Sequence, residues 1–194
     1  MEPRSAAADA RLTADDLEAL GLGLAHGCVE LAPTQPAWVL VGRRLADQVR
    51  AALGGLVVDL EPIGSTSVVG LLAKPVIDLA ASRSASGTVA SITGRLRADW
   101  IYRGDAGDQG GDVFVLESAP GRRVAHLHIV DPDGPQWHDY RALRELLRRD
   151  ERARSAYGAV KTALREHFGD NSAREYTTGK SAIVAELLLR ARTA

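Results

Sequence analysis

The sequence predicts an α/β protein of the α+β type, with a mixed five-strand sheet, flanking helices and a C-terminal helical bundle. Three observations favour this class. Short apolar stretches of strand length gather in the middle of the chain, helical periodicity marks both ends, and one helical stretch separates the second strand from the third. With 194 residues, 45% of them hydrophobic, the chain is long enough to bury a core of its own.

The first 28 residues are expected to precede the sheet. Residues 1–12 are small and polar, which is typical of a flexible tail. Residues 13–28 form a predicted helical extension, because Thr13 is a good N-cap and acidic residues fill the turn that follows it. This helix is expected to end near Ala25.

The α/β core is expected to cover residues 29–135. Pro36 fits the first position of a helix, and the glycines at 54 and 55 end it. The short turns over 104–111 and 119–121 favour antiparallel neighbours. The remaining expected elements are strands over 56–63, 75–81, 100–102, 113–116 and 124–130 and a helix over 86–98.

Residues 136–194 are predicted to be helical and to pack over a cleft in the core. Two breaks are expected in this region. One lies near Asp150, and the other at residues 169–171, where Gly, Asp and Asn follow one another.

The charge balance excludes some classes of partner. The chain has 24 basic and 25 acidic residues and a net charge of −1, whereas general binders of nucleic acids or membrane surfaces need a basic excess. It lacks an apolar run long enough for a membrane helix, and its start does not resemble a signal peptide. The single Cys28 excludes an intramolecular disulfide. A cytoplasmic protein with a small-molecule ligand is therefore expected.

Lysine is rare in this chain. Of the 24 basic residues only Lys74, Lys161 and Lys180 are lysines, and the others are arginines. The compact ammonium and the planar guanidinium are not interchangeable at a tight site. We therefore predict that the three lysines face one anionic site, with scattered surface positions as the alternative.

A run of small residues joins the first two strands. Gly64, Ser65, Thr66 and Ser67 follow the first strand, and Lys74 comes shortly before the second. Small residues let a backbone approach a ligand closely. A short helix beginning at these serines would also present free N–H groups to a phosphate. The alternative is an ordinary serine-rich turn.

Asp78 lies within the second apolar strand. An unpaired carboxylate is costly there. It therefore needs a partner, and the candidates are a metal ion, Lys74 or a set of buried hydrogen bonds.

The stretch from Gly64 to Leu79, which reads GSTSVVGLLAKPVIDL, resembles the signature of the GrpB family. Further blocks follow in the family's order and bring the resemblance to roughly residues 29–191; they are His126 to His128, Leu143 to Arg148, Tyr157 to Lys161 and Tyr176 to Lys180. The departures from the family pattern are Pro62 in place of His, Val69 in place of Pro, and Glu145 in place of Asp.

This resemblance implies the nucleotidyltransferase superfamily and its DNA polymerase β-like fold. Such enzymes are expected to hold phosphates at a Gly-Ser loop and to bind Mg²⁺ with a D-x-D pair and a third carboxylate. The metal bridges a nucleoside triphosphate such as ATP. Asp78 matches the first aspartate of the pair, but Ala80 stands at the second position and cannot bind a metal.

Two histidines are candidates to replace the missing carboxylate. Alternate residues of a strand share a face, so His126 and His128 point the same way. If their strand neighbours that of Asp78, the three form a His/His/carboxylate metal site or provide general bases. The alternative is that one histidine packs in a hydrogen-bonded core and the other faces the helices. Other candidate carboxylates are Glu61, Glu117 and Asp112.

The C-terminal helices carry two Tyr-x-x-x-Lys pairs, Tyr157 with Lys161 and Tyr176 with Lys180. Residues four apart lie on one helix face, so each pair presents a phenol and an ammonium together. The pairs are candidates to hold phosphate oxygens or to stack on a base, with helix packing as the alternative. Arg144 and Arg148 have the same spacing and are a candidate anion clamp.

Three functions fit these residues. The first is a nucleotidyltransferase-like enzyme that binds a nucleoside triphosphate with Mg²⁺ or another divalent metal and transfers a nucleotidyl group to a small acceptor. In this reading Asp78, Lys74, His126 and His128 are the catalytic candidates. The second is an enzyme of the same fold with altered chemistry, such as metal-assisted ligation or condensation. The third is a non-catalytic module that binds an anion or a nucleotide.

Overall fold

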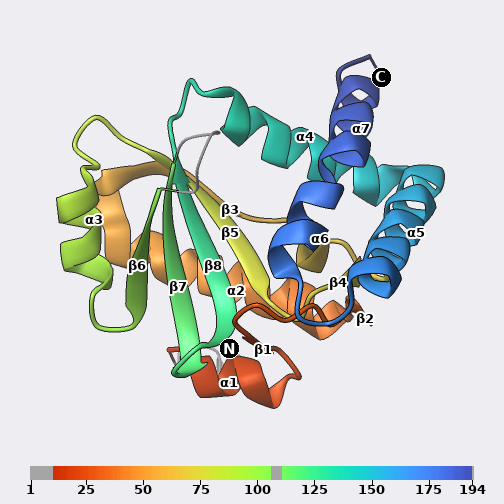
Figure 1. Ribbon diagram of the computed structural model, residues 1–194. Helices are drawn as coiled ribbons and strands as arrows, with labels where there is room; N and C mark the ends of the chain where they lie inside the picture. Colours follow the sequence, from red (N-terminus) through yellow and green to blue (C-terminus); the bar gives the residue numbers. More distant parts are fainter. Residues whose placement is uncertain (1–10, 106–110, 194) are drawn as a thin grey trace, which may run out of the picture.

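The computed structural model describes residues 11–105 and 111–193 (Figure 1). Most of the predicted tail over 1–12, and residues 106–110 of the predicted turn over 104–111, lie outside the described residues. The first half contains helices α1 (Ala14–Ala19) and α2 (Pro36–Leu53), 3-10 helices η2 (Gly54–Leu56) and η3 (Ser65–Ser67), and strands β1 (Leu24–Ala25), β2 (Ala32–Pro33), β3 (Val57–Ile63), β4 (Leu72–Ala73) and β5 (Ile77–Arg83). The second half contains helix α3 (Val89–Leu96), strands β6 (Trp100–Asp105), β7 (Asp112–Ala119) and β8 (Arg122–Val130), and helices α4 (Pro135–Arg149), α5 (Glu151–Phe168), α6 (Ala173–Gly179) and α7 (Ser181–Thr193).

The main sheet is mixed, and its five long strands follow the order β3-β5-β8-β7-β6. Strands β5 and β8 pair in parallel, and the other neighbours on this path are antiparallel. The predicted mixed sheet is therefore confirmed. The parallel pair requires a long crossover, which runs through α3 and the β6–β7 hairpin.

Short strands that the sequence did not predict complete the sheet and its surroundings. Strand β1 pairs with the beginning of β8, and β2 pairs with β4 in a separate two-stranded sheet. Strands β1, β2 and β4 are each two residues long.

The N-terminal helix is shorter than predicted. Thr13 caps α1 through a capping box with Asp16, but the helix ends at Ala19 instead of Ala25. Gly21 and Gly23 have φ angles of 78° and 125°, which a helix does not tolerate. The chain therefore turns at these glycines and continues into β1.

The helices divide between two sides of the sheet (Figure 1). Helices α1, α2 and α3 contribute to the large core that includes the fully buried Leu45, Leu60 and Leu127. Helices α4, α5 and α7 pack against one another in a second core, together with Val68 and Leu71 from the loop after β3. A small third cluster, around Trp137, joins α4 to the sheet.

Local signals place the breaks between the C-terminal helices. Asp150 caps α5 by accepting a hydrogen bond from the N–H of Ala153, and Gly169 ends α5 with a φ of 78°, so both predicted breaks are confirmed. A further break between α6 and α7, at Lys180, was not predicted. Across the described ranges, no helix has the length and hydropathy of a bilayer span.

Candidate functional site

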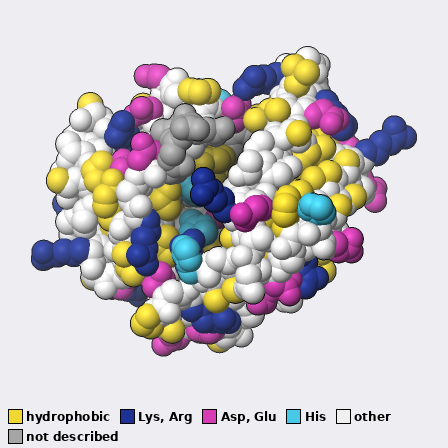
Figure 2. All heavy atoms as spheres, viewed as in Figure 1, with side chains coloured by type: hydrophobic (Ala, Val, Ile, Leu, Met, Phe, Trp, Pro, Cys, Tyr) yellow, Lys and Arg dark blue, Asp and Glu magenta, His cyan; other side chains and the backbone are white. Residues whose placement is uncertain are grey.

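A cleft of about 850 Å³ separates the sheet from helices α4, α5 and α6. Figure 2 shows it as a hollow in which histidine and basic side chains are visible. Most of the residues singled out from the sequence line this cleft: Gly64, Ser65, Thr66, Lys74, Asp78, His126, His128, Arg144, Tyr157, Lys161, Tyr176 and Lys180. Glu61 and Ser67 are not among its lining residues.

Asp78, His126 and His128 lie together on the sheet wall of the cleft. The parallel register sets Asp78 beside His126, and one ligand atom from each of the three residues lies within 4.8 Å of the others. Nδ1 of His126 is 3.1 Å from Oδ1 of Asp78. The sequence anticipated this grouping on the condition that the two strands are neighbours, and they are.

The ionisation of this group is set by its surroundings. Burial works against the charge of Asp78, but the hydrogen bond with His126 and the nearby His126, His128 and Lys74 outweigh it, so the pKa of Asp78 is lowered. Burial lowers the pKa of His128 to about 4. His128 is therefore a neutral imidazole near pH 7, with a free lone pair.

Gly64 leaves room for the carboxylate of Asp78. Its φ is 66°, and a Cβ at this position would lie 2.8 Å from Oδ2 of Asp78. A side chain here would therefore be strained and would collide with the acid. The helix at Ser65–Ser67 is a single 3-10 turn, and Ser67 donates its hydroxyl and its N–H to the carbonyl of Gly64. Such a turn is too short for the helix-end phosphate site that the sequence suggested.

Lys161 is buried in the helical wall, with 1% of its surface exposed. Its Nζ donates to Oγ of Ser65 at 3.0 Å and to the carbonyl of Leu72, and it lies 4.4 Å from the ring centre of Tyr157. These contacts connect α5 to the loop between β3 and β5. Burial, and to a lesser extent Lys180, lower the pKa of Lys161 to about 7.

Lys180 and Lys74 flank the ring of Tyr176. Their Nζ atoms lie 4.7 Å and 5.9 Å from its centre. Burial and the charge of Lys74 lower the pKa of Lys180 to about 8, although Asp78 opposes this effect. All three lysines of the chain therefore face one cleft, and the geometric part of the lysine prediction is confirmed.

The depressed pKa of Lys161 predicts a pH-dependent stability. Between pH 7 and the ordinary pKa of about 10.5, the unfolded state binds more protons at this residue than the folded state does. The free energy of unfolding should therefore rise with pH in this window, by up to about 1.4 kcal/mol per pH unit from this residue. Urea unfolding at pH 7, 8 and 9 should show a shallower rise for Lys161→Met, in which Lys180 still titrates. If the free energy of unfolding rises equally with pH in the two proteins, the lowered pKa of Lys161 is contradicted.

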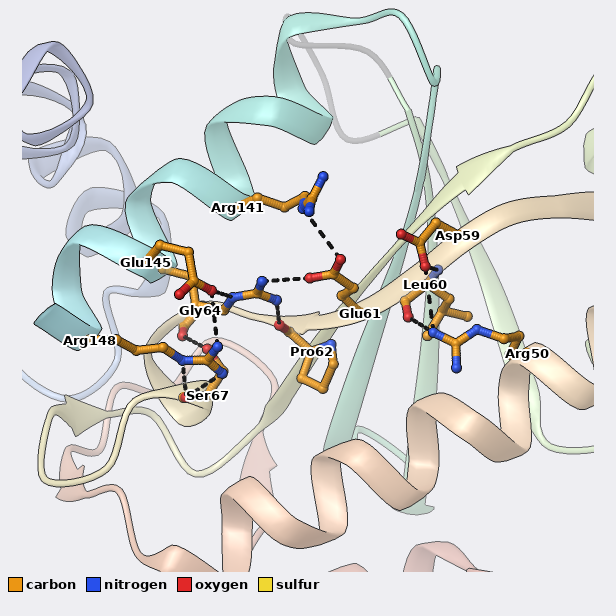
Figure 3. A network of polar contacts seen from close by, with 11 residues as sticks. Arg50, Asp59, Leu60, Glu61, Pro62, Gly64, Ser67, Arg141, Glu145 and Arg148 are labelled. Carbon is orange, nitrogen blue, oxygen red and sulfur yellow. Dashed lines mark hydrogen bonds and ion pairs between the residues drawn. The ribbon is translucent and has the colours of Figure 1, made fainter. Parts of the chain in front are cut away.

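Arg144 occupies the edge of the cleft but already has protein partners. Its guanidinium donates to Glu61, to the carbonyl of Pro62 at 2.7 Å and to Glu145 at 2.8 Å. Glu61 also pairs with Arg141 (Figure 3). This network connects α4 to β3, and it takes up the donors proposed for an anion clamp.

The other arginine and carboxylate candidates are also engaged outside the cleft. Arg148 donates to the carbonyl of Ser67 and pairs with Glu145 (Figure 3). Glu61 lies opposite Ala80 in the β3–β5 register, where the two arginines hold it, and it is not part of the Asp78 group. Glu117 pairs with Arg103, and Asp112 accepts from Tyr102.

The position of the missing second aspartate is apolar. Ala80 is fully buried and belongs to the cluster of Ile63, Val130 and Trp137. The ring of Tyr140 packs at the edge of this cluster and lies 5.6 Å from that of His128. The sequence reasoning missed Tyr140, although it stands four residues before Arg144 on the same helix face.

The donor set can be compared with the Mg²⁺ that the family resemblance led us to expect. Mg²⁺ prefers oxygen ligands, and the nucleotidyltransferase pattern supplies them from at least two carboxylates. The group described above offers one carboxylate and two imidazoles. Nε2 of His126 and Nδ1 of His128 are buried without a hydrogen-bond partner among the described residues. This set does not fit an all-oxygen Mg²⁺ site, and its nitrogens suit a transition metal.

Comparison with known protein families shows to which family this chain belongs. The family model described as GrpB protein matches residues 28–190. The chain belongs to the GrpB family. A UPF0157 protein of Streptomyces coelicolor is 33% identical over 183 residues, which cover 91% of this chain and 88% of that protein. A crystal structure of the conserved protein GrpB from Enterococcus faecalis has a TM-score of 0.74 at 28% identity and covers 84% of this chain and 98% of that one.

More distant structures show the fold class. A structure of the GLD-2/RNP-8 complex matches with a TM-score of 0.51 at 12% identity, over 78% of this chain and 60% of that chain. At this identity the likeness concerns the fold alone. The GrpB chain therefore shares its arrangement of mixed sheet and helices with that structure.

Proposed function

We propose that this chain binds a nucleoside triphosphate, or another phosphorylated ligand of similar charge, in the cleft and transfers a nucleotidyl group to a small acceptor. One observation carries the proposal. The ammonium groups of Lys74 and Lys180 and the Asp78 group line the same cleft, near enough to affect one another's charge. A phosphate chain is the type of ligand that binds ammonium groups at one end and carries a reacting phosphorus at the other.

The charge of the cleft supports an anionic ligand. Within the described part of the chain, Lys74 and Lys180 form no ion pair at salt-bridge distance, and their ammoniums repel each other. An anion placed beside the ring of Tyr176 would neutralise both. The net charge of −1 and the enclosed position of these lysines favour a small ligand over a nucleic acid.

The size of the cleft is compatible with a nucleotide. Its volume of about 850 Å³ lies within the usual range of ligand pockets. In the proposed reaction the oxygen of an acceptor hydroxyl attacks the α-phosphorus, the bond to the pyrophosphate leaving group breaks, and the hydroxyl proton is released to solvent. The lysines would hold the departing phosphates, while the sheet wall at Asp78 faces the reacting phosphorus.

A lysine substitution tests ligand binding. Lys180→Met keeps an unbranched apolar stem but removes the ammonium, so we expect ATP binding to weaken at least tenfold, since a lost charge-assisted contact costs about 1.5–3 kcal/mol. Titration calorimetry with ATP measures the change. The matched control is Arg149→Ala, because Arg149 is an exposed residue on α4. Equal ATP affinity in wild type and Lys180→Met would contradict the proposal.

A second candidate is binding without transfer, or transfer by altered chemistry such as ligation or condensation. The observation that favours it is Ala80, which packs under Trp137 where nucleotidyltransferases have a second carboxylate. Incubation with α-labelled nucleoside triphosphates and a panel of small acceptors separates the candidates. A labelled product supports nucleotidyl transfer, whereas ATP binding with no labelled product supports the second candidate.

A further inference from the structure

We infer that Asp78, His126 and His128 bind one transition-metal dication of the Zn²⁺ class, in preference to Mg²⁺, at the sheet wall of the cleft. The role of this metal in nucleotidyl transfer rests on the proposed function. The binding itself needs no nucleotide and is tested without one.

The backbone brings the three side chains together. Asp78 and His126 are register partners in the parallel β5–β8 pair, and His128 follows two residues later on the same face. Metal bonds of about 2.0–2.2 Å hold ligand atoms about 3–4 Å apart. One ligand atom from each of the three residues lies within 4.8 Å of the others, which is close to the separation that a shared metal needs.

Two unpartnered nitrogens point to a ligand. Nε2 of His126 and Nδ1 of His128 are buried, and neither forms a hydrogen bond with any described residue. A buried nitrogen without a partner is unfavourable, so two in one cluster call for an explanation. A coordinated metal would supply the missing partner.

The types of ligand atom indicate which metal ions this site prefers. Imidazole nitrogens suit Zn²⁺, Co²⁺ and Fe²⁺, whereas Mg²⁺ prefers carboxylate and water oxygens. The chain offers three ligands, and 33% of the Asp78 side chain is exposed to the cleft. Three protein ligands with an open position are typical of catalytic metal sites, while structural zinc sites are closed by four.

Titration of the purified chain with Zn²⁺ or Co²⁺ alone tests the inference. We expect one equivalent to bind at least 100-fold more tightly than Mg²⁺, with a visible absorption band in the Co²⁺ form. His126→Ala and His128→Ala should each weaken binding at least tenfold. The matched control is His167→Ala, because His167 is exposed on α5. Stoichiometric Zn²⁺ binding that survives the double substitution of His126 and His128 would overturn the inference.

A measurement on the unaltered chain covers the case in which the variants do not fold. X-ray absorption at the zinc edge of the Zn²⁺-loaded protein should show two imidazole ligands. One imidazole or none, or no Zn²⁺ binding at all, would overturn the inference. Because ATP is absent from these experiments, a failure of metal binding is distinguished from a failure of the proposed nucleotide binding.

Discussion

Substitution of Glu61 by alanine is expected to lower the free energy of unfolding by about 3 kcal/mol, because it leaves the guanidinium of Arg144 buried without its main counter-charge. The side chain of Arg144 is 8% exposed and that of Glu61 is 21% exposed. Their ion pair joins α4 to β3. Urea denaturation followed by circular dichroism measures the loss.

Glu145 provides the matched control. It also pairs with Arg144, but 52% of its side chain is exposed, so Glu145→Ala should cost less than about 1 kcal/mol. If the two substitutions cost the same, the Glu61–Arg144 pair does not anchor the helical wall of the cleft.

The second large effect is expected for Ala80→Asp, which restores the aspartate spacing of the nucleotidyltransferase pattern. Ala80 is fully buried in the cluster of Trp137 and lies opposite Glu61 in the β3–β5 register, so the new carboxylate would be desolvated and placed near another acid. We expect the free energy of unfolding to fall by about 3–5 kcal/mol. Thermal and urea unfolding in the presence and absence of 10-fold excess Mg²⁺ over protein measure the change.

The Ala80→Asn variant separates charge from size. Asn has nearly the same volume as Asp but carries no charge. The difference between the two variants in the free energy of unfolding therefore measures the cost of burying the charge. Full recovery of the Ala80→Asp protein by Mg²⁺ would show that the site accepts the ordinary two-carboxylate metal. That result would attribute the poor fit of Mg²⁺ in the unaltered chain to the missing carboxylate at position 80, and a loss of stability that Mg²⁺ leaves unchanged would contradict this attribution.

Much of the fold could be predicted from local signals. Helix α2 begins at Pro36 and ends before Gly54, as expected, because proline and glycine act at single positions. The five long strands follow from apolar runs. The two-residue strands could not be predicted because so short a segment has no periodicity, and α1 is shorter than predicted because Gly21 and Gly23 adopt positive φ angles.

The candidate site was predictable only in part. The spacing of His126 and His128 predicts that they share one face of a strand. Their approach to Asp78 depends on the order of strands in the sheet, which the spacing of residues within one strand does not reveal. For the same reason the ion pair between Glu61 and Arg144 could not be predicted from the sequence. Both residue types suited a ligand site, yet they bind each other across 83 positions of sequence. The family resemblance supplied the missing long-range information for the loop and for the lysines.

The strand order also has a consequence for folding. Strand β8 is the last long strand in the chain, yet it is inserted between β5 and β7, and it carries both imidazoles. A nascent chain that ends before Arg122 therefore has Asp78 and the serine loop but neither His126 nor His128. Such long-range parallel pairing slows folding, so the candidate metal site is completed late, when β8 closes the sheet.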